Sequence, residues 1–138
     1  MKVIVVSHGD FSKGLVNSIQ MLVGEQEDLV AYSLYPEQTV DSLREELEEE
    51  IKKTKEEEDI LFLTDLFHGS PFNVVVSLMR DYSFYHITGI NLPLAVEVMM
   101  GRYMDKNAET ICEEILNAAP GTVMDVNKMF EEEEEEGA

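Results

Sequence analysis

Two polar residues able to do chemistry follow apolar runs that are expected to be buried strands. His8 follows the run Val3 to Val6, in the stretch "VVSHGDFSKG". Asp65 follows the run Ile60 to Leu63, in the stretch "LFLTDLFHGSPFN". A carboxylate bonded to one imidazole nitrogen fixes the tautomer and leaves the lone pair of the other nitrogen free. That nitrogen can attack a phosphorus or carbonyl centre while the carboxylate stabilises the developing positive charge.

The segment "GSPFN" carries groups that a phosphoryl group would need beside such a histidine. Gly69 has no side chain to block close approach, and Ser70 offers a hydroxyl. Ser70 and Pro71 predict the start of a helix, where free N–H groups and the positive end of the dipole favour an anion. Because proline has no N–H, we expect Ser70, Phe72 and Asn73 to supply the backbone contacts. Together these groups describe a phosphoryl-accepting histidine. Residue chemistry alone leaves a second interpretation open, in which His8 is a hydrogen-bonded structural residue, Asp65 caps a turn, and Ser70 and Pro71 only start a helix.

The elements that must position these residues are predicted from the apolar pattern. Short apolar runs, expected as strands, recur at residues 3–6, 30–34, 60–63, 84–87 and 122–126. Between them, apolar residues recur every three or four positions, which is typical of amphipathic helices. This alternation favours parallel strands with right-handed crossovers. The fold class is therefore α/β, a single doubly wound domain with a mainly parallel central sheet flanked by helices.

The predicted fold decides whether the two polar residues meet. In open α/β sheets, ligands bind beyond the carboxyl ends of the strands, where the strand order reverses. If the order is the common 2-1-3-4, the first and third strands are neighbours. His8 and Asp65 would then face each other across the crevice.

Composition limits the domain plan and the partners. The chain has 138 residues and a net charge of −19, and we expect one domain over residues 1–130. Residues 131–138, which contain six successive glutamates, are expected to form an acidic disordered tail because they offer nothing to bury. Such an acidic surface repels phosphate backbones and anionic lipids, so we expect no nucleic-acid binding and no membrane insertion.

Cysteine and histidine usage gives the remaining expectations. The single cysteine, Cys112, allows no intrachain disulfide. The three histidines do not have metal-ligand spacing, so we predict no metal and no cofactor. No signal peptide and no run of about 20 apolar residues is visible. We therefore expect a soluble, cytoplasmic protein.

Three stretches together resemble the EIIA component of the mannose family of the phosphotransferase system (PTS). They are "SHGDFSKGL" followed by "MLVGEQEDL", then "LTDLFHGSPFN", then "ITGINLPLAVE". They extend from Ser7 to Glu97 and so cover most of the domain. The combination of D-L-x-x-G-S-P-x-N with G-x-N-L-P is the specific part of the resemblance.

The resemblance implies a phosphoryl carrier in coupled sugar uptake and phosphorylation. His8 would accept the phosphoryl group from phospho-HPr and pass it to a histidine of EIIB, which associates with the membrane transporter components. Asp65 would orient His8, and Ser70 would lie close to the phosphoryl group. Family members are homodimers that exchange a C-terminal strand, for which residues 122–126 are the candidate here. The resemblance does not identify the sugar.

One position departs from the family pattern, and two other functions remain open. The family usually has Gly-Gly before Ser-Pro, whereas this chain has His68, which we interpret as a spectator facing solvent or the partner. A small phosphohydrolase could use His8 as its nucleophile, but it would need a cationic phosphate clamp. Of ten lysines and arginines, only Lys13 falls within the site motifs. A non-catalytic regulatory module that binds ligands in the same crevice is the other alternative.

Overall fold

A computed structural model of the protein describes residues 1–137. Its centre is a four-stranded sheet in the order β2-β1-β3-β4. Its strands are β1 (Lys2–His8), β2 (Leu29–Leu34), β3 (Ile60–Thr64) and β4 (Tyr85–Thr88). All three neighbouring pairs run parallel. The predicted α/β fold class and the assumed order of the first four strands are therefore confirmed.

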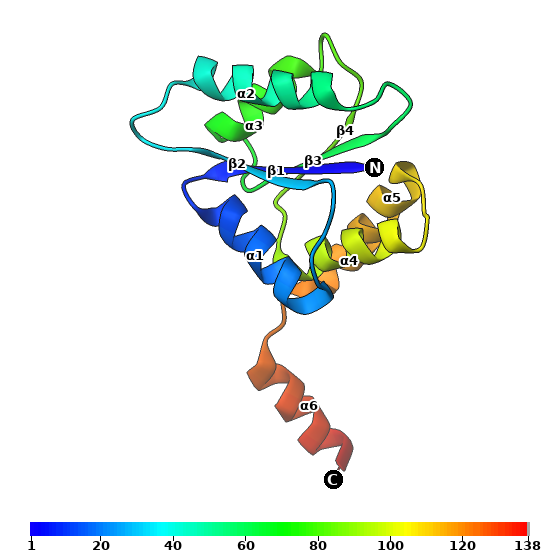
Figure 1. Ribbon diagram of the computed structural model, residues 1–138. Helices are drawn as coiled ribbons and strands as arrows, with labels where there is room; N and C mark the ends of the chain where they lie inside the picture. The colour runs from blue at the N-terminus through cyan, green and yellow to red at the C-terminus, as the bar shows by residue number, and fades with distance from the viewer. Residues whose placement is uncertain (138) are drawn as a thin grey trace.

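Helices cover both faces of the sheet (Figure 1). One layer holds α2 (Val40–Lys53) and α3 (Ser70–Leu78). The other holds α1 (Phe11–Val23), α4 (Leu92–Tyr103) and α5 (Ala108–Ala118). The 3₁₀ turn η1 (Ala119–Thr122) and helix α6 (Val126–Gly137) end the chain. None of the helices in residues 1–137 is both long enough and apolar enough to span a bilayer.

The central strand β1 divides the interior into two apolar clusters. Val3 and Val5 pack toward α1, α4 and α5. Ile4 and Val6 pack toward α2 and α3. Successive side chains of a strand point to opposite faces, so an unbroken apolar run is what a strand covered on both sides requires. The buried part of β1 ends at Ser7, so His8 lies at the exposed end of the strand.

The C-terminal segment of the single chain forms a turn and a helix. No strand forms at residues 122–126 of the described chain, because Thr122 ends η1 and Val126 begins α6. The Thr122 hydroxyl donates to the carbonyl of Ala119 and accepts from Asn91, which holds the turn closed. The backbone N–H of Lys128 donates to the Asp125 carboxylate, which caps α6.

The glutamate run, which we expect to be a disordered tail, belongs to an exposed helix in the structure. It continues α6 to Gly137, whereas residue 138 of the expected tail lies outside the described residues. Glutamate is a good helix former, which accounts for the helix once Asp125 has capped it. Every residue of α6 is exposed, and the helix projects away from the domain (Figure 1).

Candidate functional site

His8 and Asp65 meet at the carboxyl edge of the sheet. β1 and β3 are neighbours in parallel register, with Val6 opposite Thr64. The imidazole Nδ1 of His8 lies 2.8 Å from Oδ2 of Asp65, and the backbone N–H of His8 donates to the same oxygen at 2.9 Å. An ionised carboxylate only accepts hydrogen bonds, so Nδ1 carries the hydrogen. Nε2 is then left with a free lone pair.

The two side chains differ sharply in exposure. The His8 side chain is 48% exposed, whereas that of Asp65 is 14% exposed. Oδ1 of Asp65 is buried and has no hydrogen-bond partner among the described residues. A carboxylate oxygen without donors keeps its negative potential directed at the neighbouring ring, where positive charge would develop during nucleophilic attack. The ring is thus open to a reactant, and its carboxylate is sheltered.

The backbone at Gly69 lies against the reactive edge of the His8 ring. A Cβ atom built on Gly69 would lie 2.6 Å from Cε1 and 3.3 Å from Nε2 of His8. The φ angle of Gly69 is −79°, which any residue adopts, so glycine is needed here for space rather than for conformation. This contact places Nε2 beside the N-terminus of α3.

The start of α3 offers part of the anion cradle that the sequence predicts. Pro71 occupies the first turn of the helix. Within the described chain, no partner accepts from the backbone N–H groups of Ser70 and Phe72. The N–H of Asn73 donates to the Gly69 carbonyl at 2.9 Å, so in this structure that group is already engaged. The exposed side chain of Asn73 remains a candidate contact.

A buried hydroxyl network, which the sequence analysis missed, holds the turn that follows His8. The hydroxyl of Ser7 accepts from the backbone N–H of Ser12 at 2.7 Å. The hydroxyl of Ser12 donates to the carbonyl of Tyr32 at 2.8 Å and lies 3.0 Å from that of Ser33. Serines inside otherwise apolar segments were the available signal for this network, because buried hydroxyls require partners.

A second feature absent from the sequence analysis is a groove on the β2 side of His8. It has a volume of about 290 Å³ and is lined by His8, Gly9, Leu34, Tyr35 and Pro36. The N–H of Gly9 donates to the Leu34 carbonyl at 2.9 Å, which joins the two loops that form the groove. Residues that follow the second strand must lie at the same sheet edge as His8, so strand order was the signal that could have identified them.

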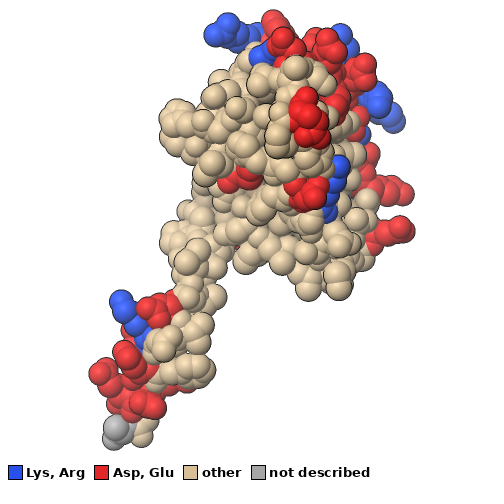
Figure 2. Space-filling model, turned by 90° about the vertical axis from the view of Figure 1, so that its left-hand side faces the viewer, with Lys and Arg blue, Asp and Glu red and all other residues tan. Residues whose placement is uncertain are grey.

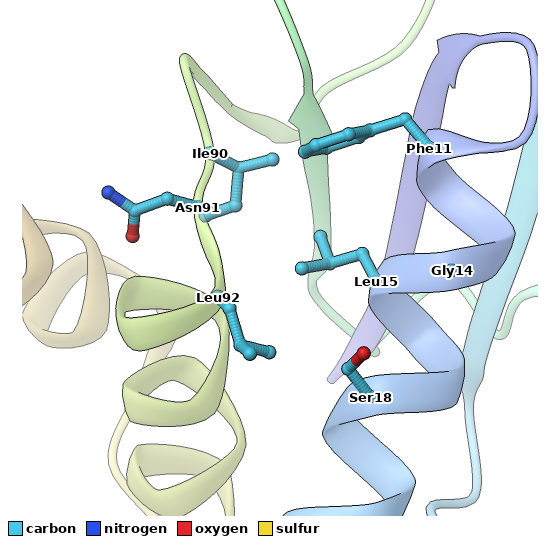
Figure 3. Close-up of a pocket in the computed structure, with 7 residues that line it drawn as sticks. All are labelled: Phe11, Gly14, Leu15, Ser18, Ile90, Asn91 and Leu92. Carbon is cyan, nitrogen blue, oxygen red and sulfur yellow. The ribbon is translucent and has the colours of Figure 1, made fainter.

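Aromatic side chains surround the site on its other sides. Phe11 is 47% exposed and Phe67 is 60% exposed, and the rings of Phe67 and Phe72 have centroids 5.2 Å apart. Phe11 also lies at the mouth of a mainly apolar groove of about 440 Å³ between α1 and the start of α4. Figure 3 shows its ring pointing toward Ile90 across this groove.

The other two histidines have different surroundings. His68 is exposed, and its φ angle is +65°, in the left-handed region that favours glycine. Its ring centroid lies 3.7 Å from that of Phe67. His86 lies in β4, with Nε2 2.9 Å from the hydroxyl of Thr64. Burial lowers the pKa of His86 to about 4, so its ring is neutral near pH 7 and has a structural role.

Comparison with known families decides what kind of protein carries this site. The EIIA-man family model, described as "PTS system fructose IIA component", matches residues 2–116. The chain belongs to this family. It is therefore a mannose-family EIIA component with a role in sugar phosphotransfer, as the sequence motifs predict.

Individual EIIA relatives agree with this assignment. The PTS system fructose-specific EIIA component of Bacillus subtilis (strain 168) is 34% identical over 100 residues, which are 72% of this chain and 68% of that protein. The mannose-specific EIIAB component of Escherichia coli (strain K12) is 30% identical over 110 residues, or 79% of this chain. The chain spans only about a third of the length of that relative, 34%.

Solved structures of EIIA proteins share the fold. The EIIA component from Streptococcus agalactiae superposes with a TM-score of 0.83 at 28% identity, covering 92% of this chain and 98% of its own. The mannose/sorbose-specific IIA subunit from Enterococcus faecalis gives a TM-score of 0.81 at 26% identity, covering 90% of this chain and 92% of its own.

Proposed function

We propose that His8 is the phosphoryl-carrying residue of this EIIA component. In this proposal His8 accepts the phosphoryl group from phospho-HPr and passes it to a histidine of EIIB. The observation that carries the proposal is the exposed imidazole held at Nδ1 by Asp65, with its Nε2 edge against Gly69. The Escherichia coli relative is an EIIAB component, a name that joins an A and a B unit in one protein, which supports EIIB as the acceptor.

Phosphoryl transfer between two histidines requires correctly positioned groups rather than a metal or a nucleotide. The lone pair of His8 Nε2 attacks phosphorus while the bond from phosphorus to the donor's nitrogen breaks, and that electron pair returns to the donor's imidazole. Asp65 stabilises the positive charge that develops on the His8 ring. The free N–H groups of Ser70 and Phe72, together with the Ser70 hydroxyl, would bind the phosphoryl oxygens. Transfer to EIIB is the same step in reverse.

The surface around His8 suits a transient protein partner. Figure 2 views the carboxyl edge of the sheet: charged side chains gather at the top of the domain, where α2 lies, and along α6, whereas the middle of this face carries few. Exposed Phe11 and Phe67 supply apolar contact area there. HPr and EIIB would each bury these two aromatic side chains in turn. A modest interface allows the rapid release that a carrier needs.

We also expect a homodimer that uses the C-terminal segment. Five large apolar side chains of this segment are between 44% and 83% exposed: Val123, Met124, Val126, Met129 and Phe130. Backbone angles at Val123 are extended, at φ −114° and ψ 120°, and β4 is an edge strand. Pairing with β4 of a second copy would convert residues 122–126 into an exchanged strand and cover part of this apolar surface.

One labelling experiment tests the carrier against both alternatives. The protein is incubated with phosphoenolpyruvate, enzyme I and HPr, with His8→Ala as the control. A stoichiometric, acid-labile phosphate that passes to EIIB is expected for the wild type and not for the variant. Continuous phosphate release without EIIB would indicate a phosphohydrolase. Absence of label would indicate a regulatory binding module.

A further inference from the structure

The first turn of α1 departs from the usual rules for helix termini. Asp10 stands at the N-cap position but makes no capping hydrogen bond with its side chain. The hydroxyl of Ser7 bonds the N–H of Ser12 instead. Lys13 lies in the same first turn, where a cation opposes the helix dipole. Sequences break such local rules mainly at functional positions.

Asp10 and Lys13 are instead joined through the hydroxyl of Tyr35. The Lys13 ammonium donates to this hydroxyl at 2.7 Å, and the hydroxyl donates to Oδ1 of Asp10 at 2.6 Å. The ammonium also lies 4.9 Å from the centroid of the Tyr35 ring. The hydrogen bond to Tyr35 raises the pKa of Lys13 above its usual value, so the side chain is charged throughout the physiological range. Lys13 forms no direct ion pair with a carboxylate of the described residues.

This cation is held on a residue of the groove that opens beside the reactive ring. Tyr35 and His8 line the same groove, and Lys13 is held on Tyr35. A phosphoryl group adds a charge of about −1.5 to −2 at neutral pH. The carboxylates that face this region, Asp65 and Asp10, would repel that charge. Lys13 is the one basic residue within the site motifs that can oppose their effect.

We propose that Lys13 leaves the Tyr35 hydroxyl and binds an oxygen of the phosphoryl group when His8 is phosphorylated. Tyr35 and Asp10 are then positioning residues that hold the flexible lysine side chain near the site while His8 is free. Lys13 contributes a charge-assisted hydrogen bond to the anion during transfer and in the phosphorylated protein. This inference rests on the proposed phosphorylation of His8.

The titration of the phosphoryl group tests the contact directly. An adjacent cation favours the more highly charged form of an ionisable group, so Lys13 should lower the pH at which the phosphoryl group takes up its proton. We expect the ³¹P chemical shift of phosphorylated wild type to titrate at lower pH than that of Lys13→Met. Lys13→Arg should retain the low midpoint, and so should Tyr35→Phe, which removes only the resting partner of the lysine.

Transfer rates give a second measurement with a matched control. Lys13→Met should slow phosphorylation by phospho-HPr roughly tenfold, the effect of losing one hydrogen bond to a charged group. Lys52→Met removes the same charge from an exposed position of α2, where Lys52 pairs with Glu48, and should not change the rate. Equal ³¹P midpoints and equal rates for wild type and Lys13→Met would overturn the inference. If the wild type accepted no phosphate, the proposed function itself would fail instead.

Discussion

Replacing Gly69 by alanine tests the close approach between α3 and the His8 ring. The new Cβ would lie 2.6 Å from Cε1 of His8, whereas carbon atoms in favourable contact are about 3.5–4.0 Å apart. The ring or the α3 backbone must therefore move by about 1 Å. Asp65 holds the ring at Nδ1, so a displaced ring either stretches that bond or turns Nε2 away from the start of α3.

The expected result is a large loss of phosphoryl transfer with a small loss of stability. A misplacement of about 1 Å can reduce the rate of a well-aligned reaction roughly hundredfold, and we expect a reduction of that size in the phosphorylation rate. Stability should fall by only about 1 kcal/mol, because the His8 ring is half exposed and can move outward, and because alanine is a poorer N-cap than glycine.

Two measurements and one control separate these effects. Single-turnover phosphorylation by phospho-HPr gives the rate, and urea unfolding gives the free energy of unfolding. Gly121→Ala is the matched control, because a Cβ at Gly121 meets no atom within 4 Å. Wild-type phosphorylation rates in Gly69→Ala would refute the inferred placement of Nε2 beside Gly69. A Gly69→Ala protein that failed to fold would refute the assumption that the ring can move outward.

Further changes test other parts of the structure. Asp65→Asn should slow phosphorylation roughly hundredfold without unfolding the protein, since the ring loses its orienting negative charge; an unchanged labelling rate would contradict the role of Asp65. His68→Gly should raise the free energy of unfolding by about 1 kcal/mol, because it relieves the left-handed backbone at φ +65°, and urea unfolding measures this. His86 has a folded-state pKa of about 4 against about 6.5 when unfolded, so the unfolded chain binds the extra proton between these values. Stability should therefore fall as pH falls from about 6.5 to about 4, and fall less in His86→Gln; equal pH dependence would contradict the burial of this ring. Removing residues 123–138 should give a monomer in sedimentation velocity, and a persistent dimer would exclude the C-terminal segment as the interface.

The fold and the central pair were accessible from sequence because both depend on local patterns. Apolar runs such as Val3 to Val6 are buried on both faces, and their alternation with helices leaves few possible topologies. Once the strand order is 2-1-3-4, the ends of the first and third strands must meet. The proximity of His8 and Asp65 follows from that strand order.

The remaining parts of the site depend on where side chains reach across loops. The bond from Lys13 to Tyr35 joins residues 22 positions apart, and no spacing rule encodes it. The strand expected at residues 122–126 is absent from the single chain for a related reason. A short apolar run such as Val123 and Met124 has the same sequence pattern in a strand and in an exposed connecting segment. Only the presence of a neighbouring strand to pair with distinguishes the two.

Asp65 holds His8 by two hydrogen bonds, which has a consequence for a cycle of phosphorylation and transfer. One oxygen accepts both from the imidazole and from the main-chain amide of the same residue. If a phosphorylated His8 ring rotated about χ1 to meet another protein, the hydrogen bond from the backbone N–H of His8 to Asp65 would be unaffected. The carboxylate would therefore keep its position. In a phosphoryl carrier, the empty imidazole would then return to a carboxylate that has not moved, and the site would reset by rotation of one side chain without a loop rearrangement.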